Sequence, residues 1–327
     1  MNEIVLVTGA TGFVGSHVAE RLLSSGKTVR LLVRDAQRRK WLDANNFQIA
    51  VGDVTKSETL PAALHGVSCV VHCAGLTKAK SRAEYLRVNA HATREFARCA
   101  EQAGIARFVF CSSLAAAGPS ASGQPLSEAD MPKPISSYGV SKLEGERAVA
   151  EECRSTQWIT IRPPAVMGPR DEQFLPLFSM AKRFGVYTSA GSAAREYSLI
   201  GVHDLSRALC AAVDTQSGVN EIYFATLPTA YSWRAVANEI GALAGKRLRS
   251  VYIPELAARA VGICGSAWMC MTNRPVLLNS EKVTEMLASG WSCSGEKILA
   301  TWGFECEQSL RDVVRDTWNF YSSQGWL

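Results

Sequence analysis

Short apolar runs alternate with helix-like segments through the first half of the chain. The apolar runs predict buried strands at residues 4–7, 28–33, 47–51, 69–72, 107–111 and 158–161. Apolar positions with helical spacing predict helices at residues 16–23, 57–65, 83–103 and 138–153. Strands that alternate with helices are typical of a parallel sheet covered on both faces. We therefore expect an α/β fold with a doubly wound parallel sheet.

Local signals mark the ends of two of these helices. Ser57 is expected to cap the helix at residues 57–65, and Pro61 falls in its early turns, where proline is tolerated. Gly104 is expected to end the long helix at residues 83–103. Both helices would then lead into the next strand through short connections.

The alternation weakens after Arg162. Prolines punctuate a segment that reads as loop-rich: Pro163, Pro164, Pro169 and Pro176. A further helix opens at residues 202–205, where His203 and Asp204 are expected to cap or orient it, and residues 221–225 predict a late strand. The tail from Ser250 has helical spacing. We expect one larger domain at residues 1–162, to which residues 201–226 return, and a smaller, mostly helical lobe at residues 163–200 and 250–327.

Charge and composition limit the classes of molecule that the protein is expected to bind. Hydrophobic residues make up 47% of the 327 residues and charged residues 20%, as is ordinary for a globular chain. The net charge of +5 suits a phosphorylated cofactor or an anionic substrate. It is too small to indicate nucleic acid, and there is no run of five or more like charges. We expect a small-molecule substrate and no nucleic-acid partner.

The distribution of cysteines and of apolar stretches indicates the cellular compartment in which the protein is expected. The ten cysteines are scattered, without a C-x-x-C pair or the Cys/His spacing of a zinc site, so no metal is expected. Met1 is followed almost at once by the first strand, which does not resemble a signal peptide, and we expect a cytoplasmic protein. The longest apolar stretch, residues 256–271, contains Arg259 and is too short to span a bilayer. It is expected to be a helix over the substrate pocket; the alternative is a membrane-surface helix that admits a lipophilic substrate.

A glycine-rich turn follows the first strand. Gly9, Gly12 and Gly15 have G-x-x-G-x-x-G spacing between a buried strand and a helix. In that context the first glycine allows a tight turn, the second lets a pyrophosphate approach the backbone, and the third lets the helix pack closely. Free N–H groups at the start of the helix, aided by its dipole, can then hold the anion.

A tyrosine and a lysine four residues apart open a predicted helix. Tyr138 and Lys142 would lie on one face, so the lysine charge is expected to lower the pKa of the phenol toward neutrality. The phenol could then give or accept a proton. Ser113 follows the fifth strand, and its hydroxyl could orient a substrate oxygen toward Tyr138.

Together these motifs resemble the extended short-chain dehydrogenase/reductases, the epimerase/dehydratase-like branch. The resemblance covers the first 170 residues in order, and the matching residues are 8–15, Gly52, Asp53, 72–75, Asn89, Ser112, Ser113, 138–142, Arg162 and Pro163. It implies a Rossmann fold that binds a dinucleotide in the larger domain and substrate in the lobe. It also implies Tyr138 as acid/base, Lys142 as pKa modulator and ribose ligand, and Ser113, 25 residues before Tyr138, as substrate-oxygen ligand.

The resemblance implies further site residues. Asn89 would support the active site, and Asp53 and Val54 would contact the adenine. The expected cofactor-contacting residues are Gly9, Thr11, Gly12, Phe13, Val14, Gly15, Arg34, Asp53, Val54, Ala74, Gly75, Tyr138, Lys142, Pro163 and Val166. Relatives often pair two such chains through helices that include the one with the tyrosine, so a homodimer is expected.

The residues after the second strand bear on the choice of cofactor. NAD-using relatives commonly have an acid there, but this chain has Val33, followed by Arg34, with Arg38 expected nearby. An arginine accommodates a 2′-phosphate, which favours NADP(H). Asp35 keeps NAD(H) open, because a small shift in register would let it bind the ribose.

The residues after Ser113 narrow the reaction. Related 4,6-dehydratases have a Thr-Asp-Glu at this position, whereas Leu114 and Ala115 supply no carboxylate. The pattern of residues 29–34 and the tail that ends at residues 325–327 look more like the 3β-hydroxysteroid dehydrogenase and dihydroflavonol reductase side. We expect an oxidoreductase that interconverts a ketone and a secondary alcohol on a fairly apolar substrate. Two alternatives stay open: a nucleotide-sugar epimerase with tightly bound NAD, and a non-catalytic nucleotide-sensing or scaffold protein.

Overall fold

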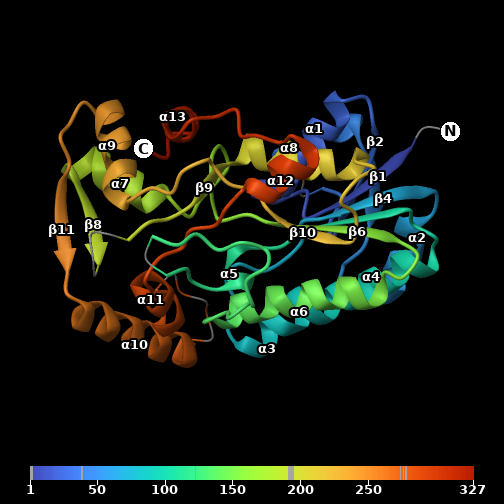
Figure 1. The fold of residues 1–327 in the computed structure, drawn as a ribbon, viewed down its shortest axis with the longest axis horizontal. Helices are drawn as coiled ribbons and strands as arrows, with labels where there is room; N and C mark the ends of the chain where they lie inside the picture. The colour runs from blue at the N-terminus through green and yellow to red at the C-terminus, as the bar shows by residue number, and fades with distance from the viewer. Residues whose placement is uncertain are drawn as a thin grey trace.

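A seven-stranded parallel sheet forms the centre of the molecule (Figure 1). The computed structural model describes residues 3–37, 40–121, 123–190, 195–272, 274, 276 and 278–327. The strand order is β10-β6-β5-β4-β1-β2-β3, and every neighbouring pair is parallel. The strands are β1 Ile4–Thr8, β2 Thr28–Val33, β3 Gln48–Val51, β4 Val67–His72, β5 Arg107–Cys111, β6 Gln157–Arg162 and β10 Glu221–Phe224. The predicted doubly wound sheet is confirmed, with each predicted strand in place.

Helices cover both faces of this sheet (Figure 1). On one face α1 and α8 pack on each other, and on the other α4 and α6 do the same. The helices of these two layers are α1 Phe13–Ser24, α2 Leu60–Leu64, α4 Ala92–Gln102, α6 Ser137–Glu152 and α8 Val202–Asp214. Short connections hold η1 Ala44–Asn46, α3 Arg82–Tyr85 and α5 Leu114–Ala117. Because the sheet is parallel, all the loops that follow its strands meet at one edge.

The helix predicted at residues 57–65 is two elements, and Ser57 does not cap it. A 3₁₀ turn, η2 Ser57–Thr59, precedes α2 Leu60–Leu64, and Lys56 is the residue before the turn. Pro61 explains the break, because it has no N–H to donate to the Ser57 carbonyl four residues earlier. The Leu60 N–H bonds to that carbonyl instead, with 3₁₀ spacing.

The long helix predicted at residues 83–103 is also interrupted. After α3, residues Leu86–His91 form a π-helix, η3, before α4 continues to Gln102. Gly104 follows the end with a φ of 68°, as the glycine rule predicts. Apolar spacing could not reveal the wider π turn, which brings Asn89 to the sheet edge.

The segment after β6 contains more regular structure than its prolines indicate. Two small parallel ladders lie outside the central sheet, β7 against β9 and β8 against β11. Helix α9 forms where no element was predicted. Strand β11 includes residues 250–253, where a helix was predicted, so that prediction is wrong for these residues. The elements are β7 Ala165–Met167, α7 Leu175–Phe184, β8 Val186–Ala190, β9 Leu199–Gly201, α9 Trp233–Ala244 and β11 Arg249–Ile253.

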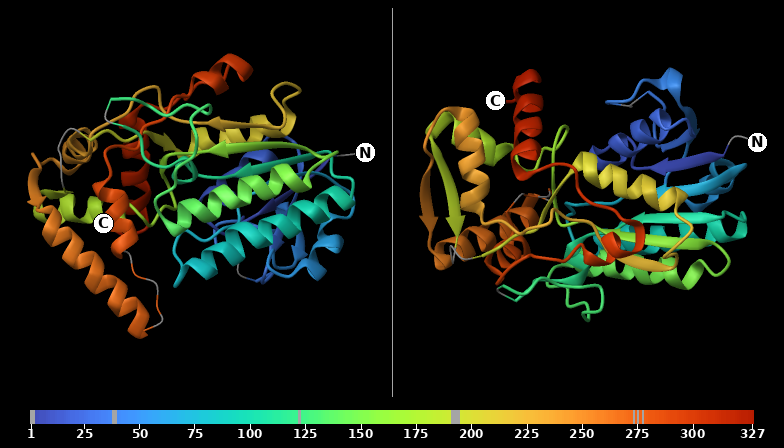
Figure 2. Two further views of the ribbon diagram at one scale, coloured as in Figure 1. Left: turned by 60° about the horizontal axis from the view of Figure 1, so that its bottom comes forward. Right: turned by 45° about the horizontal axis from the view of Figure 1, so that its top comes forward.

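The tail is helical from residue 255 onward, as predicted. Its helices are α10 Glu255–Thr272, α11 Ser280–Leu287, α12 Glu296–Trp302 and α13 Leu310–Ser323. They spread over the molecule, with α12 against β10 and α13 against α9 (Figure 2). No helix among the described residues is both long and apolar enough to cross a membrane.

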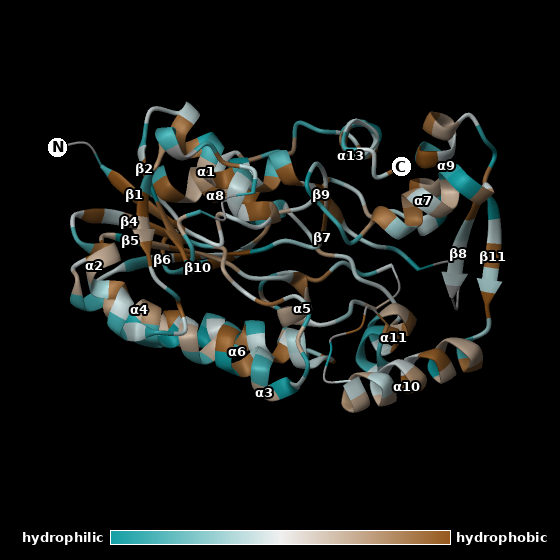
Figure 3. Ribbon diagram, turned by 180° about the vertical axis from the view of Figure 1, so that it is seen from behind, coloured by the Kyte–Doolittle hydropathy of each residue, from teal (hydrophilic) through white to brown (hydrophobic). Residues whose placement is uncertain are grey.

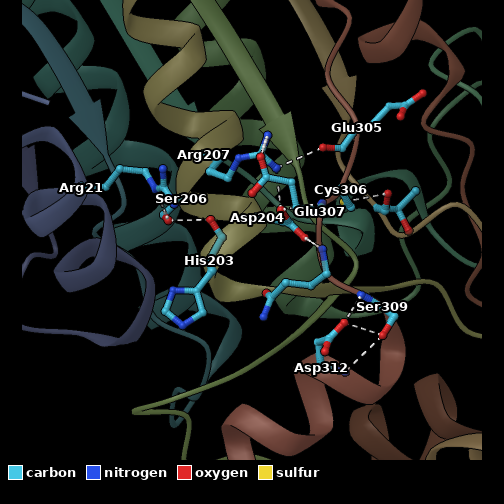
Figure 4. Close-up of polar contacts among 12 residues, drawn as sticks. Arg21, His203, Asp204, Ser206, Arg207, Glu305, Cys306, Glu307, Ser309 and Asp312 are labelled. Carbon is cyan, nitrogen blue, oxygen red and sulfur yellow. Dashed lines mark hydrogen bonds and ion pairs between the residues drawn. The ribbon is translucent and has the colours of Figure 1, made fainter. Parts of the chain in front are cut away.

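Asp204 anchors this tail to the sheet layers rather than capping its own helix (Figure 4). Its carboxylate accepts the backbone N–H groups of Glu307 and Gln308, both at 3.0 Å, and pairs with Arg207 at 2.7 Å. Gly201 is the residue that caps α8. Asp204 therefore does not cap α8, which was one of the two expected roles. Two of its three partners lie about a hundred residues away, where sequence spacing gives no signal.

Candidate active site

The glycine turn between β1 and α1 can hold no larger residues at two positions. Gly9 has a φ of 70°, and a Cβ there would lie 2.7 Å from the Ala74 backbone nitrogen. A Cβ on Gly15 would overlap the Gly9 carbonyl oxygen, so the helix packs on the turn itself. These contacts bring the turn against the residues that follow β4.

The first turn of α1 offers backbone donors to a ligand. Gly12 is the N-cap residue and supplies no side-chain oxygen to the N–H groups of the turn. Phe13 begins the helix, and Val14 packs on the core beneath it. Thr11 and Phe13 are half-buried, and Gly12 is exposed. Uncapped N–H groups at a glycine-lined helix start fit the pyrophosphate of a dinucleotide.

A buried chain of hydrogen bonds joins the turn to Asn89. Thr8 Oγ1 accepts the Ala74 N–H at 3.1 Å and lies 2.7 Å from His72 Nδ1. His72 Nε2 lies 3.1 Å from Thr93 Oγ1, which donates its proton to the Asn89 carbonyl. Since the Thr93 proton is used, His72 Nε2 carries a hydrogen and Nδ1 accepts from Thr8. Burial lowers the pKa of His72 to about 3, in agreement with a neutral ring.

Asn89 fixes the backbone that follows Gly75. Its Oδ1 accepts the Leu76 N–H at 2.7 Å, and its Nδ2 donates to the Leu76 carbonyl at 2.9 Å. The same Nδ2 donates to Ser141 Oγ on α6 at 3.0 Å. A Cβ on Gly75 would lie 3.1 Å from Asn89 Oδ1. The asparagine therefore holds the loop after β4 against the helix of Tyr138.

Ser113 and Tyr138 meet at the carboxyl edge of the sheet. The Ser113 hydroxyl lies close enough to the Tyr138 phenol to affect its pKa, and Ser113 Oγ accepts the Ala115 N–H at 3.1 Å. The Leu114 N–H donates to the Pro163 carbonyl at 2.7 Å, so the loops after β5 and β6 support each other. Residues 25 positions apart in the sequence are thus brought into contact by β5 and α6.

Lys142 does not lower the pKa of Tyr138 in this structure, in contrast to the expectation. Its Nζ donates to the Cys111 carbonyl at 2.7 Å and lies over the Phe110 ring, 4.2 Å from the centroid. Burial raises the pKa of Tyr138 above its ordinary value, against the opposing effect of the nearby Ser113 hydroxyl. Burial also lowers the pKa of Lys142. The side-chain spacing was predicted correctly, but a nearby carbonyl competes for the ammonium group.

Lys142 nevertheless lies close to the loop that follows β4. A Cβ on Gly75 would lie 3.9 Å from Lys142 Nζ, so the ammonium group is close to this loop. Gly12 and Gly75 leave backbone exposed where a dinucleotide would run, and Gly9 is half-buried beside them. The residues present therefore fit the expected cofactor.

The tail contributes neighbours of Tyr138 that the sequence analysis missed. Glu281 on α11 accepts the backbone N–H of Ser137 at 2.9 Å and its hydroxyl at 2.5 Å. The Tyr85 ring lies 5.9 Å from that of Tyr138, and the Tyr85 hydroxyl donates to the Thr77 carbonyl. Glu281 and Glu285 contribute to a pKa of Tyr85 raised to about 12, mainly by burial. No local motif signals a residue that acts from so far along the chain.

A buried ion pair lies behind Ser112. Arg162, the last residue of β6, bonds to Glu146 through two nitrogens at 2.8 and 2.6 Å, and both side chains are nearly inaccessible. Ser112 Oγ donates to the same carboxylate. The pair joins β6, α6 and the end of β5, which positions Ser113 and Tyr138 relative to one another. Arg162 was noted in the sequence, but its partner was not.

The predicted adenine end lies after β2 and β3. Arg34 is exposed and close enough to Asp53 to help lower the pKa of that carboxyl, which also accepts the backbone and side-chain hydrogens of Thr55. Val54 packs against the core beside it. Arg38 lies outside the described residues. Val166 lies half-buried in β7, beyond Pro163.

Comparisons with known proteins agree with this geometry. The model of the NAD dependent epimerase/dehydratase family matches residues 5–225. A ceramide reductase from Caulobacter vibrioides is 31% identical over 326 residues, which are 99% of this chain and 96% of the relative. A UDP-glucose 4-epimerase from Vibrio cholerae is 29% identical over 236 residues, 68% of this chain and 70% of the relative.

Solved structures show the same fold. MoeE5, in complex with UDP-glucose and NAD, has a TM-score of 0.78 and 24% identity, and the match covers 98% of this chain and 99% of that one. The family match spans the glycine turn, Ser113, Tyr138 and β10. The protein is an NAD(P)-dependent enzyme, and the chain belongs to the NAD dependent epimerase/dehydratase family.

Proposed function

We propose that the protein is an NADP(H)-dependent oxidoreductase that interconverts a ketone and a secondary alcohol on a lipophilic substrate. The observation that carries this proposal is the placement of the Ser113 and Tyr138 side chains next to each other at the sheet edge beside the glycine turn. A phenol and a hydroxyl placed together can bind one carbonyl oxygen from two sides. Asn89 would support this arrangement by fixing the loop after Gly75.

The state of Tyr138 suits reduction of a ketone. Because burial raises the pKa of its phenol, Tyr138 is protonated near neutral pH and can donate to an oxygen that gains charge. Ser113 would orient the same oxygen. A bound nicotinamide would supply or accept the hydride at the adjoining carbon. In the opposite direction Tyr138 would have to take the alcohol proton.

The proposed cofactor preference rests on Arg34. Its side chain is exposed at the end of β2, where a guanidinium can form charge-assisted hydrogen bonds with a 2′-phosphate. Asp53 lies near it and would face the ribose or adenine. NAD(H) remains the alternative cofactor.

The proposed substrate class follows from the site and from the relatives. The loop after Ser113 is apolar, since α5 consists of Leu114 and three alanines and is mostly buried. The relative that matches almost the whole chain is a ceramide reductase. Ceramide-type lipids with a ketone on the long chain are therefore the first substrates to test.

Native mass spectrometry of the purified protein, alone and after addition of NADPH or NADH, tests the proposal. A protein that arrives empty, takes up NADPH in preference, and consumes it when given a ketone lipid in mixed micelles would support it. A protein that arrives with NAD already bound and interconverts UDP-sugars without net NAD turnover would instead be an epimerase. A protein that binds the cofactor but converts neither substrate class would contradict the reductase proposal.

A further inference from the structure

Helix α10 turns its small residues toward the protein and its large apolar residues toward solvent. A Cβ on Gly262 would lie 2.9 Å from the Val283 side chain, and one on Gly265 would overlap the Leu278 carbonyl, so α10 rests closely on α11. Ser266 completes the contact through a 3.0 Å hydrogen bond to Ser280. Gly262 is the one buried residue among the described residues of α10, and it has no side chain. The covered side is thus too small to account for the hydrophobicity of the helix.

The exposed side carries the large residues. We use "the α10 face" for the exposed apolar side chains of α10 and the adjoining end of β11: Val251, Tyr252, Leu256, Val261, Ile263, Trp268 and Met271. Leu256 is 83% exposed and Met271 82%. Arg259 is the sole charged residue between positions 256 and 271. Contiguous exposed apolar residues of this kind mark a surface that another molecule covers.

Cations border this face. Helices α3 and α10 lie along the same edge of the molecule (Figures 1 and 3), and Figure 3 colours much of α10 as hydrophobic. The influence of Glu281 and Glu285 on Tyr85 also places α11 beside α3. The exposed basic residues of α3, of α10 and of the segments next to these helices are Lys78, Lys80, Arg82, Arg259 and Arg274. The exposed Glu255 of α10 pairs with Arg195.

We propose that the α10 face binds the surface of an anionic phospholipid bilayer. An apolar helix face rimmed by Lys and Arg inserts its apolar residues at the headgroup boundary, and the cations contact anionic lipids. A second copy of this chain fits less well, because a two-fold contact would bring the same cations together. Charge complementarity therefore favours a membrane over self-association.

The bilayer would lie next to the catalytic residues. Helix α10 packs on α11, and Glu281 of α11 accepts hydrogen bonds from Ser137 at the start of the Tyr138 helix. A lipid substrate could thus pass from the membrane to the site beside Tyr138 without crossing water. This second step rests on the proposed function, whereas binding to the bilayer does not.

Vesicle flotation of the full chain tests membrane binding without any substrate. The vesicles are phosphatidylcholine alone, or phosphatidylcholine with about one-third phosphatidylglycerol, at low and high salt. We expect flotation with the anionic vesicles and loss of it at high salt. The variant Leu256→Ser/Trp268→Ser/Met271→Ser removes the apolar part, and Arg259→Glu/Arg274→Glu reverses the charge. The charge reversal should weaken partitioning of the protein onto vesicles at least about tenfold, since one basic residue contributes about fivefold. The triple variant should weaken it at least about tenfold as well, since membrane binding scales with the apolar area that is buried.

Matched variants at distant exposed sites are the controls. Leu299→Ser on α12 and Arg154→Glu before β6 should float like the wild type. Melting temperature and uptake of NADPH by each variant show whether it has folded. Absence of flotation with anionic vesicles would overturn the proposal. The proposal would also be overturned if the wild type is a dimer that binds no vesicles and the triple variant is a monomer. A protein that floats but reduces no lipid ketone would retain the membrane site and lose only the proposed substrate.

Discussion

The Glu281 carboxylate accepts both the backbone N–H and the hydroxyl of Ser137, the residue before Tyr138. The two residues are 144 positions apart, so the tail itself closes the start of the helix that carries the acid/base. An acidic group at a helix N-terminus also interacts favourably with the helix dipole. Helix α11 is therefore part of the support of the candidate site.

Replacement of Glu281 should loosen this support. We expect Glu281→Ala to lower the free energy of unfolding by about 1 kcal/mol, because two donors lose their partner at an accessible site. It should lower kcat/KM about tenfold, since Tyr138 would be held less firmly against Ser113. Thr284→Ala on the same helix is the control and should leave kcat/KM near the wild-type value. Equal losses in both variants would show a general effect of α11 instead.

Tyr138→Phe should abolish most of the activity without loss of the cofactor. Removal of the proton donor is expected to lower kcat about 10²–10⁴-fold, while the Kd for NADPH changes little. Tyr85→Phe is a matched control, because its ring lies 5.9 Å from that of Tyr138 and its hydroxyl donates to the Thr77 carbonyl rather than to Tyr138. Comparable activity of Tyr138→Phe and wild type would refute Tyr138 as the acid/base.

Local patterns were enough to predict the strands of the sheet and the glycine turn after the first strand. Parallel strands buried on both faces are continuous apolar runs, and a glycine turn between strand and helix has its own spacing, so β1 to β6 and Gly9 to Gly15 could be read directly. The Tyr138–Lys142 spacing placed both side chains on one helix face. These signals all lie within a few residues of one another.

The features that could not be predicted depend on distant partners. Glu281 meets Ser137, Asp204 meets Glu307, and Lys142 bonds to the Cys111 carbonyl, and no local spacing encodes these contacts. The π-helix that places Asn89 is stabilised by hydrogen bonds to Leu76 after β4. Proline punctuation also suggested loops where β7 and α7 form, because Pro176 lies in the first turn of α7, where its missing N–H costs nothing.

Cofactor preference should depend on Arg34. If its guanidinium binds a 2′-phosphate, Arg34→Ala should raise the Kd for NADPH roughly 10–100-fold and leave the Kd for NADH nearly unchanged. Isothermal titration with each nucleotide measures both values. Arg154→Ala, an exposed arginine at the opposite ends of the strands, should alter neither. A similar rise for both nucleotides would show that Arg34 only shapes the loop.

Removal of one partner of the buried Arg162–Glu146 pair should lower the free energy of unfolding strongly, whereas replacement of both partners should lower it much less. Glu146→Leu leaves the guanidinium without a carboxylate in a dry site and should lower the free energy of unfolding by about 3–5 kcal/mol. The double variant Glu146→Leu/Arg162→Met should recover much of this loss, because no unpaired charge remains. Urea unfolding measures both. Glu144→Ala, which breaks an exposed pair with Arg147 on the same helix, should cost less than about 1 kcal/mol. A double variant no more stable than Glu146→Leu would contradict this account.

Stability should fall in acid because His72 is buried as a neutral ring. Its folded pKa of about 3 lies below the unfolded value of about 6.5, so below pH 6.5 the unfolded chain binds a proton that the folded protein does not. Stability from this group is therefore complete above pH 6.5 and decreases as the pH falls toward 3, by up to about 1.4 kcal/mol per pH unit. His17, with a pKa lowered to about 4 chiefly by burial, should add to the same slope. In urea unfolding from pH 7 to pH 4, His72→Gln should show a shallower loss than the wild type, whatever its stability at pH 7. His65→Gln, at an exposed position, controls for the removal of one histidine. If His72→Gln and the wild type lose stability in parallel, the ring is not held neutral by the bonds to Thr8 and Thr93.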